Sequence, residues 1–402
     1  MKTKRFYYII AALSFILVII SCDKTLPNAP EENLLLDGPL EGLTHEQQLQ
    51  FLKGDIAFND DVFTVEKGLG PLFNANSCAT CHAGDGKGHP FIGFTRFGQT
   101  DATGNNFLNQ GAPQLQNKAI PGYAPEQLPA GATFSNLLAP AVTGLGFLDA
   151  VSDADLIALS DPNDINNDGI SGVPHWNTIP EYAKAQLRPN TITNGGKHIT
   201  RFGKKGAAYN LLQQTSEAYN QDMGITSVFE IIDTYSGLEI DPEVGTEQVN
   251  DVVFYLKTLK APLRRDETNP DVIEGEKLFT EMKCASCHTP TLQTGPSTIE
   301  ALSNKTFHPY TDLLLHDMGT LLDDNYTEGF ALTSEWKTPA LWGLGLSQDS
   351  QGGTYFLMHD GRAKSIEEAI LLHGGEALQS KNKYEQLLES KKKQVLKFLE
   401  SL

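Results

Sequence analysis

The sequence predicts a mainly α-helical protein with two similar halves in tandem, long loops, and an insertion of loops and short strands in the first half. Three observations support this fold class. The pattern C-x-x-C-H occurs twice, 206 residues apart, and a similar amphipathic stretch closes each half. The 402 residues also exceed what one compact core usually holds. With 40% hydrophobic and 20% charged residues, the composition is that of a globular chain.

The N-terminus has the layout of a secretory signal. Lys2, Lys4 and Arg5 precede an apolar run that continues to Ile20. A positive region followed by a short apolar run is typical of a signal peptide, which we place at residues 1–21.

Cys22 directly follows this segment, after the small residue Ser21, as in a bacterial lipobox. We therefore expect lipidation at Cys22, a flexible tether over residues 22–45, and an exported lipoprotein that faces the periplasm or is anchored at the outer membrane. The alternative is a signal-anchor helix with an incidental cysteine. The apolar run is short for the ~20 residues of a membrane span.

The charge of the chain is strongly negative, with 31 Lys and Arg against 50 Asp and Glu. Removing residues 1–21 deletes three cations and no acid, so the formal charge changes from −19 to −22. Nucleic-acid binding needs a basic surface, and we exclude it on this ground. An acidic surface favours a basic protein partner.

The other four cysteines define the chemistry. C-x-x-C-H is the attachment signature of c-type haem, in which both thiols bond the porphyrin and the histidine is the proximal iron ligand. The residues are Cys78, Cys81 and His82 in the first half, and Cys284, Cys287 and His288 in the second. A redox disulfide does not need the histidine, and the pairs of a Cys₄ zinc site usually lie closer in sequence. The sequence predicts two covalently bound haem c groups.

Matching elements surround the two motifs. Leu72-Phe73 and Leu278-Phe279 lie at the same offsets before them, so we expect an N-terminal helix leading into each motif. Residues 252–259 and 395–402 have apolar positions at i, i+3, i+4 and i+7, which predicts a closing amphipathic helix in each half. With the Pro262–Pro270 segment as linker, we place one haem domain at 46–262 and the other at 263–402.

The first half contains an insertion from about Gly84 to Asn250. Residues 91–97 and 132–148 are expected to form loops with short strands. The insertion also contains the start of a calcium-type loop. Its positions 1, 3 and 5 are occupied by Asp164, Asn166 and Asp168, with Gly at position 6. Position 12 is His175, which excludes a full EF-hand, so a partial Ca²⁺ site and a simple Asx-rich turn remain as alternatives.

A helix is predicted after Ser365, which is a favourable N-cap residue. That helix carries His373 on its last turn, where the imidazole is placed to approach the second iron opposite His288. The alternative is that His373 serves as a favourable cation at a helix end.

These motifs resemble the bacterial di-haem cytochrome c peroxidases, and most closely their relatives, the di-haem oxidoreductases with a thiol-oxidoreductase-like label. The likeness covers roughly residues 60–402. Besides the two C-x-x-C-H sites, it rests on residues 201–203, 222–227, 311–319, 336–341 and 359–363. The resemblance implies two cytochrome c-like haem domains in tandem, with His82 and His288 as proximal ligands and His373 as the sixth ligand of the electron-transferring haem.

The resemblance also implies a peroxide site. In the peroxidases, a Gln and a Glu before Met-Gly line the peroxide pocket, and Gln214 and Asp222 hold similar places here. A carboxylate there moves a proton between the two peroxide oxygens. We take Asp222 and Gln214 as catalytic candidates. The alternative is that Asp222 only caps a helix end or loop.

Several other residues are candidates for contact with haem. Arg201 and Arg362, with Lys204 and Lys205, are suited to bind the haem propionates, because buried carboxylates need cations. The remaining histidines considered as propionate partners or alternative ligands are His198, His316 and His359, each of which has a purely structural alternative.

Three functions follow. The first is reduction of hydrogen peroxide with electrons from a small donor cytochrome or cupredoxin of basic charge. The second is electron transfer without catalysis by a membrane-tethered protein whose haems are both six-coordinate. The third is oxidation of thiols or of a partner's side chain. For this third function the chain has no redox dithiol besides its haem cysteines.

Overall fold

A computed structural model describes residues 30–101 and 104–402 of the protein. The chain forms two compact units, residues 1–35 and 36–402. In the first unit, Glu32–Leu34 form a short 3-10 helix, η1. The predicted signal peptide and Cys22 lie outside the described residues. All elements below belong to the second unit.

Helix makes up 35% of the structure and strand 13%. The helices are α2 (His45–Asn59), α3 (Cys78–Cys81), α4 (Leu145–Asp149), α5 (Asp153–Leu159), α6 (Glu181–Lys184), α7 (Leu211–Met223), α8 (Thr246–Thr258), α9 (Pro270–Glu281), α10 (Ser347–Ser350), α11 (Ile366–Leu372), α12 (Leu378–Glu385) and α13 (Glu389–Ser401). Two 3-10 turns matter for the site, η6 (Cys284–Ser286) and η8 (Gly375–Ala377). In residues 36–402, no described helix is long and apolar enough to cross a membrane.

The strands are short and pair in small antiparallel sheets, within the described residues. They are β1 (Leu72–Phe73), β2 (Phe94–Phe97), β3 (Thr100–Asp101), β4 (Gly104–Asn105), β5 (Gln114–Leu115), β6 (Lys118–Ala119), β7 (Phe134–Leu137), β8 (His175–Asn177), β9 (Thr193–Asn194), β10 (Lys197–Thr200), β11 (Leu292–Gln293), β12 (Thr306–Phe307), β13 (Leu315–Asp317) and β14 (Glu335–Lys337). β2 and β7 fall where the sequence predicted short strands in the insertion. The second half also contains strands, which the sequence analysis did not predict.

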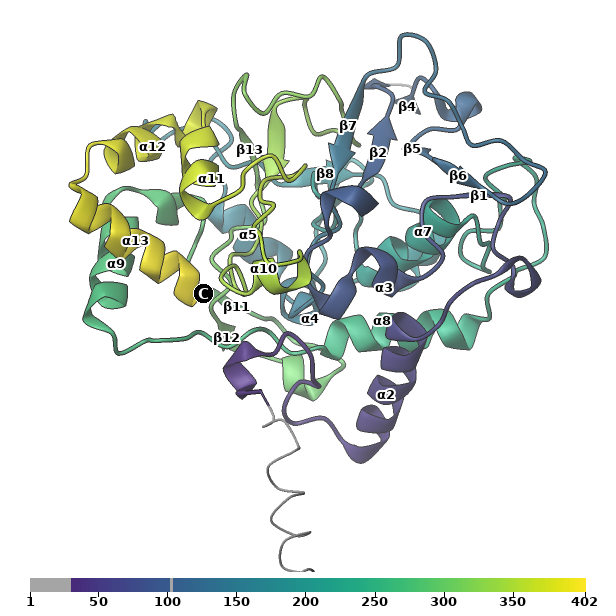
Figure 1. The fold of residues 1–402 in the computed structure, drawn as a ribbon, viewed down its shortest axis with the longest axis horizontal. Helices are drawn as coiled ribbons and strands as arrows, with labels where there is room; N and C mark the ends of the chain where they lie inside the picture. Colours follow the sequence, from purple (N-terminus) through teal and green to yellow (C-terminus); the bar gives the residue numbers. More distant parts are fainter. Residues whose placement is uncertain (1–29, 102–103) are drawn as a thin grey trace, which may run out of the picture. The chain divides into compact units, whose positions relative to one another are not determined.

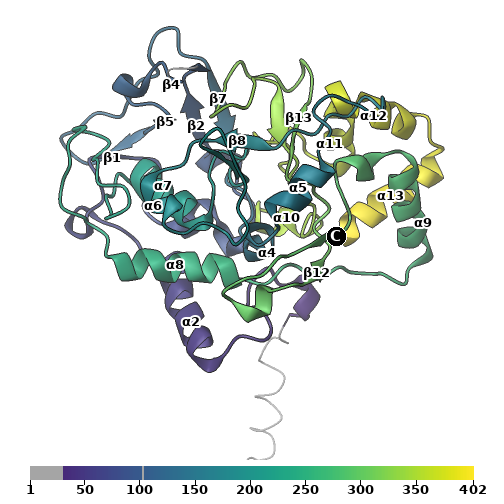
Figure 2. The same cartoon turned by 180° about the vertical axis from the view of Figure 1, so that it is seen from behind.

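Each half contains a pair of crossing helices, α2 with α8 and α9 with α13 (Figures 1 and 2). A glycine lies at each crossing. A Cβ at Gly54 would run into the backbone oxygen of Asp251, and one at Gly275 into that of Gln394. Only a residue without a side chain allows the helix axes to approach so closely. The predicted closing helices are therefore confirmed as α8 and α13.

The residue four positions after each glycine is a phenylalanine that packs beside a motif histidine. The Phe58 and His82 ring centroids are 5.7 Å apart, and those of Phe279 and His288 are 6.3 Å apart. Phe58, and not Phe73, is therefore the counterpart of Phe279.

The prediction of a helix leading directly into each motif is accordingly wrong for the first half. α2 ends at Asn59, and residues 60–77 separate it from Cys78. Leu72-Phe73 is instead strand β1, which pairs with Lys118–Ala119 of the insertion. Pairing with the insertion therefore makes Leu72-Phe73 a strand, although its position relative to Cys78 had predicted a helix.

The predicted tether also needs correction over residues 36–45. Leu43 is buried and packs with Ile299 and Leu302. The backbone on either side of Pro39 is hydrogen-bonded to the end of α8: the Leu40 amide donates to the carbonyl of Thr258 (2.7 Å). Burial of Leu43 and these backbone bonds fix this part of the chain.

The two halves have separate main cores. One gathers α2, α7 and α8 around residues such as Tyr219 and Tyr255, and the other gathers α9, α11 and α13 around Phe279 and Phe398. The two groups of helices lie at opposite ends of the second unit in both views (Figures 1 and 2). Each core supports one C-x-x-C-H motif.

Candidate functional site

The first motif forms the one-turn helix α3, capped by Ser77, whose side chain accepts a hydrogen bond from the Thr80 amide. His82 follows as the C-cap, and its Nδ1 donates to the Pro140 carbonyl (2.9 Å). This bond leaves Nε2 as the free ligating nitrogen, as is usual for metal-bound histidine. Burial lowers the pKa of His82 to about 4, so the imidazole is neutral, the form that binds a metal.

The second motif has two neighbouring histidines, His288 and His373, whose rings are tilted by 52° to each other. His288 donates from Nδ1 to the Tyr310 carbonyl (3.0 Å), and His373 donates from Nδ1 to the Ala369 carbonyl (2.7 Å). Their ring centroids are 6.5 Å apart. An imidazole nitrogen lies about 2 Å from its metal, so two rings on opposite sides of one metal have centroids about 6 Å apart. The pair therefore fits an iron between them.

Burial disfavours charge on the motif thiols. It raises the pKa of Cys78, Cys81 and Cys284 to about 12, and it also raises that of Cys287. A redox dithiol or a thiolate metal site needs a lowered thiol pKa. The environment thus fits thioether attachment, which leaves the sulfur uncharged.

A small hollow of about 80 Å³ lies beside the first motif. Its lining residues include Pro140, the hydrogen-bond partner of His82, and one face of α7. Gln214 and Asp222 lie two turns apart on that face, so the structure brings the two catalytic candidates together. No histidine, methionine, cysteine or tyrosine is among the described residues that line the hollow.

Asp222 lies in the last turn of α7, which continues to Met223. Gln114 donates from Nε2 to Asp222 Oδ1, while Oδ2 has no partner among the described residues. Burial raises the pKa of Asp222 to about 6, although the bond from Gln114 and the charge of Arg96 oppose the rise. The negative charge of Asp222 also acts on both Cys78 and Cys81.

The hollow also contains polar residues that the sequence analysis missed. Arg96 forms an ion pair with Glu328 (2.7 Å) and donates to Gln221 (2.7 Å). Burial raises the pKa of Glu217 to about 7. Arg96, Glu217 and Glu328 also line a second hollow of about 220 Å³, so the two hollows adjoin. No motif marks these residues, although Glu217 has helical spacing with Gln214 and Gln221.

The two arginines predicted to bind propionates already have protein partners. The fully buried Arg201 donates to Asp153 (2.6 Å) and to the Val151 carbonyl (2.7 Å). Arg362 donates to Asp360 (2.7 Å) and to the Leu321 carbonyl (2.7 Å). Both guanidinium groups therefore hold the chain itself together, and the structure does not place them as free propionate partners.

Three other cations lack such partners. Within residues 30–101 and 104–402, no hydrogen bond or ion pair involves Nζ of Lys87, Lys204 or Lys337. Burial lowers the pKa of Lys204 to about 7 and of the other two to about 8, and both neighbours add to the effect on Lys204. Lys205, in contrast, donates to three backbone carbonyls. Three partly buried ammonium groups without counterions fit the carboxylates of haem.

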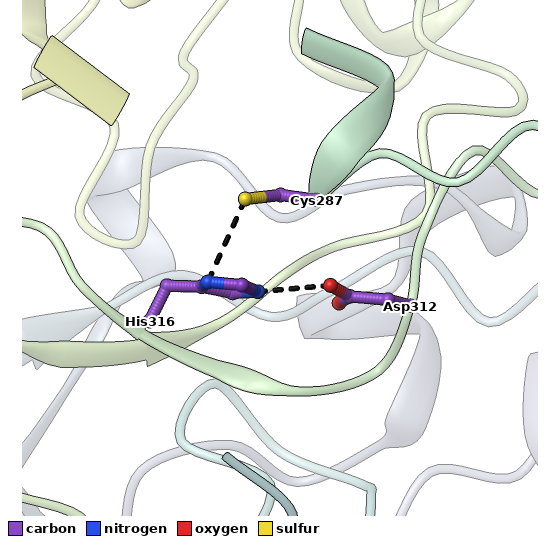
Figure 3. A group of neighbouring side chains, drawn as sticks. All are labelled: Cys287, Asp312 and His316. Atoms are coloured by element: carbon purple, nitrogen blue, oxygen red, sulfur yellow. Dashed lines mark hydrogen bonds and ion pairs between the residues drawn. The ribbon is translucent and has the colours of Figure 1, made fainter. Parts of the chain in front are cut away.

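A cluster of polar side chains lies beside the second motif. His316 Nε2 is 2.8 Å from Asp312 Oδ2, and its Nδ1 is 2.7 Å from Glu376 Oε2 and 3.5 Å from Cys287 Sγ. Figure 3 shows the imidazole between Cys287 and Asp312. The ligand atoms of these three residues lie within 4.8 Å of one another, as in a metal site. If Cys287 is bonded to haem, its sulfur can no longer serve as one of the three ligands of a metal site here.

The other candidates have structural contacts. His198 is buried against Tyr209 and does not line the hollow at His82. His359 is stacked on Trp336 and bonded to Asp324 (2.7 Å). In the predicted calcium loop, the side-chain oxygen of Asn166 accepts the amide of Asp168, two residues on (2.9 Å), as the Asx-turn alternative expects. Calcium binding stays a prediction.

Comparison with known proteins gives a family match over most of the chain. The model of the family described as "Di-haem oxidoreductase, putative peroxidase" matches residues 135–402. No curated protein matches.

Similar solved structures are distant. Hydrazine synthase of Kuenenia stuttgartiensis is 13% identical with a TM-score of 0.40, covering 94% of this chain and 98% of that one. The diheme peroxidase BthA of Burkholderia thailandensis is also 13% identical with a TM-score of 0.40, covering 94% of both chains. A MauG-like protein associated with microbial copper homeostasis is 14% identical with a TM-score of 0.33, covering 70% of this chain and 94% of that one.

Proposed function

Because the chain belongs to the di-haem oxidoreductase family, we propose that it is a di-haem c-type cytochrome that reduces hydrogen peroxide with electrons from a small donor protein. The two haems are attached in tandem cytochrome c-like domains through Cys78 and Cys81, and through Cys284 and Cys287. His82 and His288 are the proximal ligands, and His373 is the sixth ligand of the second haem.

The difference between the two sites is the observation that carries this proposal. The second site is closed by His373, 6.5 Å from His288. The first site opens on a hollow whose described lining has no strong iron ligand and contains an amide and a carboxyl group, those of Gln214 and Asp222. One closed and one open site suit electron entry at the second haem and substrate binding at the first.

When bound, haem supplies the iron at which peroxide is held and the electrons that reduce it. Above about pH 6 Asp222 is a carboxylate, and its free Oδ2 takes a proton from one peroxide oxygen and returns it to the other, so that the second oxygen leaves as water. Gln114 keeps the carboxylate oriented through Oδ1. Gln214, on the same face of α7, orients the peroxide by its amide.

Lys87, Lys204 and Lys337 are the residues that we assign to the haem carboxylates. Lys204 acts electrostatically on His82, and Lys337 interacts with Asp312 beside the second motif. We therefore assign these three lysines to the carboxylates of both haems. Propionate binding would neutralise three cations that otherwise have no partner.

The partners and location remain those expected from the sequence. The donor is a small basic cytochrome or cupredoxin, attracted by the formal charge of −22 that the chain carries without residues 1–21. A lipid on Cys22 anchors the protein to a membrane, with the body facing the periplasm or attached at the outer membrane.

The test is spectroscopy combined with turnover. In the oxidised and half-reduced holoprotein, electron paramagnetic resonance should show one low-spin haem and one haem that becomes high-spin. His373→Ala should convert the second haem to high-spin as well. Two low-spin haems in every redox state, with no peroxide consumption from a reduced donor cytochrome, would instead identify a non-catalytic electron carrier.

A further inference from the structure

His373, the sixth ligand of the proposed second haem, lies between the end of α11 and the 3-10 turn η8. α11 ends at Leu372, and His373 follows it in extended conformation (φ −64°, ψ 135°). Its ring donates from Nδ1 to the Ala369 carbonyl of α11, but its backbone has left the helix, so the segment that follows also sets the position of this imidazole. The chain then turns through η8, where Glu376 lies three residues after His373.

Glu376 is held by four donor groups from three residues. Its Oε1 accepts the hydroxyl of Ser171 (2.6 Å) and the amide of Asp317 (3.2 Å). Its Oε2 accepts the Ser171 amide (3.0 Å) and is 2.7 Å from His316 Nδ1. η8 thereby lies against β13, where a Cβ on Gly375 would run into the Asp317 carbonyl.

The other nitrogen of His316 reaches the proximal side. Its Nε2 donates to Asp312 Oδ2 (2.8 Å), and Asp312 is two residues beyond Tyr310, whose carbonyl accepts the hydrogen bond of the proximal His288. Tyr310 and Leu313 both have positive φ, so this loop has a defined, sharply turned path. One buried ring thus contacts the loops of both ligands.

Both contacts require a protonated ring. Each carboxylate accepts a hydrogen bond, so the two nitrogens both donate and the ring is an imidazolium. Burial opposes this charge, but hydrogen bonds with Asp312, Cys287 and Glu376 outweigh it and raise the pKa of His316 to about 12. Charge-assisted bonds on both sides are stronger than neutral ones.

We infer that His316 is a positioning residue that holds His373 in place as sixth ligand of the second haem, by bridging Asp312 on the proximal loop to Glu376 on the distal segment. This inference rests on the proposed function only in its assignment of His288 and His373 to one iron. It also explains why neither nitrogen of His316 is free to bind a propionate or an iron.

The test uses Glu376→Ala in the holoprotein, because this variant removes one side of the bridge and leaves the His316–Asp312 pair intact. We expect the second haem to gain a high-spin signal in electron paramagnetic resonance. In the fully reduced protein, carbon monoxide bound per molecule should rise from one equivalent to two. Loss of stability alone would not change the number of haems that bind carbon monoxide.

Two variants serve as controls. Glu376→Gln keeps an oxygen that accepts from Nδ1 and should restore the low-spin signal and one equivalent of carbon monoxide. Ser171→Ala removes the hydroxyl bond to Oε1 of Glu376, keeps the bond between His316 and Oε2, and should behave as the wild type.

If Glu376→Ala keeps a wild-type low-spin spectrum and binds one equivalent, the bridge does not position His373 and the inference is overturned. If the wild-type protein already has a high-spin second haem, the assignment of His373 fails first, and the proposed function must be revised.

Discussion

Asp222 shows how a single residue obtains its chemistry from its surroundings. Its carboxyl group lies partly buried at the end of α7, with one oxygen bonded to Gln114 and the other free toward the hollow. Burial is the dominant influence on its pKa, which is about 6 instead of the usual 3.8. A carboxyl group with a pKa near the working pH can both take and return a proton.

We therefore expect a pH dependence of peroxide reduction that belongs to Asp222. Activity should rise from about pH 5 to about pH 7, with a midpoint near 6, because the base is the deprotonated form whose population grows as pH passes the raised pKa. Asp222→Asn should lower kcat by roughly 10²–10⁴-fold and abolish this rise. Steady-state kinetics with a reduced donor measures both.

Asp251→Asn is the matched control, since Asp251 lies on α8 outside the hollow and bonds Gln50. It should leave the pH profile unchanged. Wild-type turnover in Asp222→Asn with unchanged haem spectra would show that Asp222 only caps the helix.

A second prediction at this scale concerns Lys204. Replacing it with leucine removes a cation from beside the first haem site, and this loss disfavours the reduced iron. We expect the reduction potential of the first haem to fall by tens of millivolts, given that a tenfold change in a one-electron equilibrium is about 59 mV. Spectroelectrochemical titration of the holoprotein measures this shift.

Lys53→Leu provides the comparison. Lys53 is exposed and pairs with Glu247 on the surface (3.2 Å), so its removal should leave both potentials unchanged. Equal potentials in the wild type and Lys204→Leu would exclude Lys204 as a partner of the haem carboxylates.

At the scale of elements, each half depends on one close helix crossing. α2 crosses α8 at Gly54, and α9 crosses α13 at Gly275, with a phenylalanine four residues later packing beside the motif histidine. The crossing thus determines the position of Phe58 and Phe279 relative to His82 and His288. Helix packing and the iron-binding histidine are coupled in the same way in both halves.

Gly54→Ala should therefore destabilise the first half. The added methyl group meets the backbone of α8, which cannot yield without separating the helices, and overpacking of this kind costs typically about 1–3 kcal/mol. Denaturant unfolding followed by far-ultraviolet circular dichroism measures the loss.

Gly295→Ala is the matched substitution, because this loop glycine has no left-handed φ and a Cβ there would make only ordinary contacts, at 3.6 Å or more. It should change stability by less than about 0.5 kcal/mol. If the two variants were equally stable, the close crossing would not be a constraint.

At the scale of the whole molecule, the acidic charge is the dominant feature. The chain carries 50 acidic against 31 basic residues, so its long-range field attracts a basic partner and repels an acidic one. This field acts on the rate of encounter more than on the strength of the complex.

The rate constant for reduction by a basic donor cytochrome should accordingly fall steeply as ionic strength rises, because salt screens the attraction over about 10 Å at 0.1 M. Stopped-flow mixing with basic and acidic donors, over a series of salt concentrations, measures the effect. A rate with the basic donor that does not depend on salt would contradict electrostatic docking.

The sequence by itself determined the features that depend on neighbours along the chain. The two C-x-x-C-H motifs, the closing helices α8 and α13, and the helix before His373 could be predicted because their signals repeat within a few residues. Gln214 and Asp222 were paired through the resemblance to the peroxidases, and α7 then places them eight residues apart on one face.

Only the tertiary structure decided the features built from distant segments. The histidine partners Pro140 and Tyr310, the hollow with Arg96 and Glu328, and the bridge through His316 join residues that no local pattern connects. The insertion explains one error in the first half, since its residues Lys118–Ala119 pair with Leu72-Phe73 and hold them as a strand. Contacts over such distances depend on the path of the whole chain, which composition and periodicity do not record.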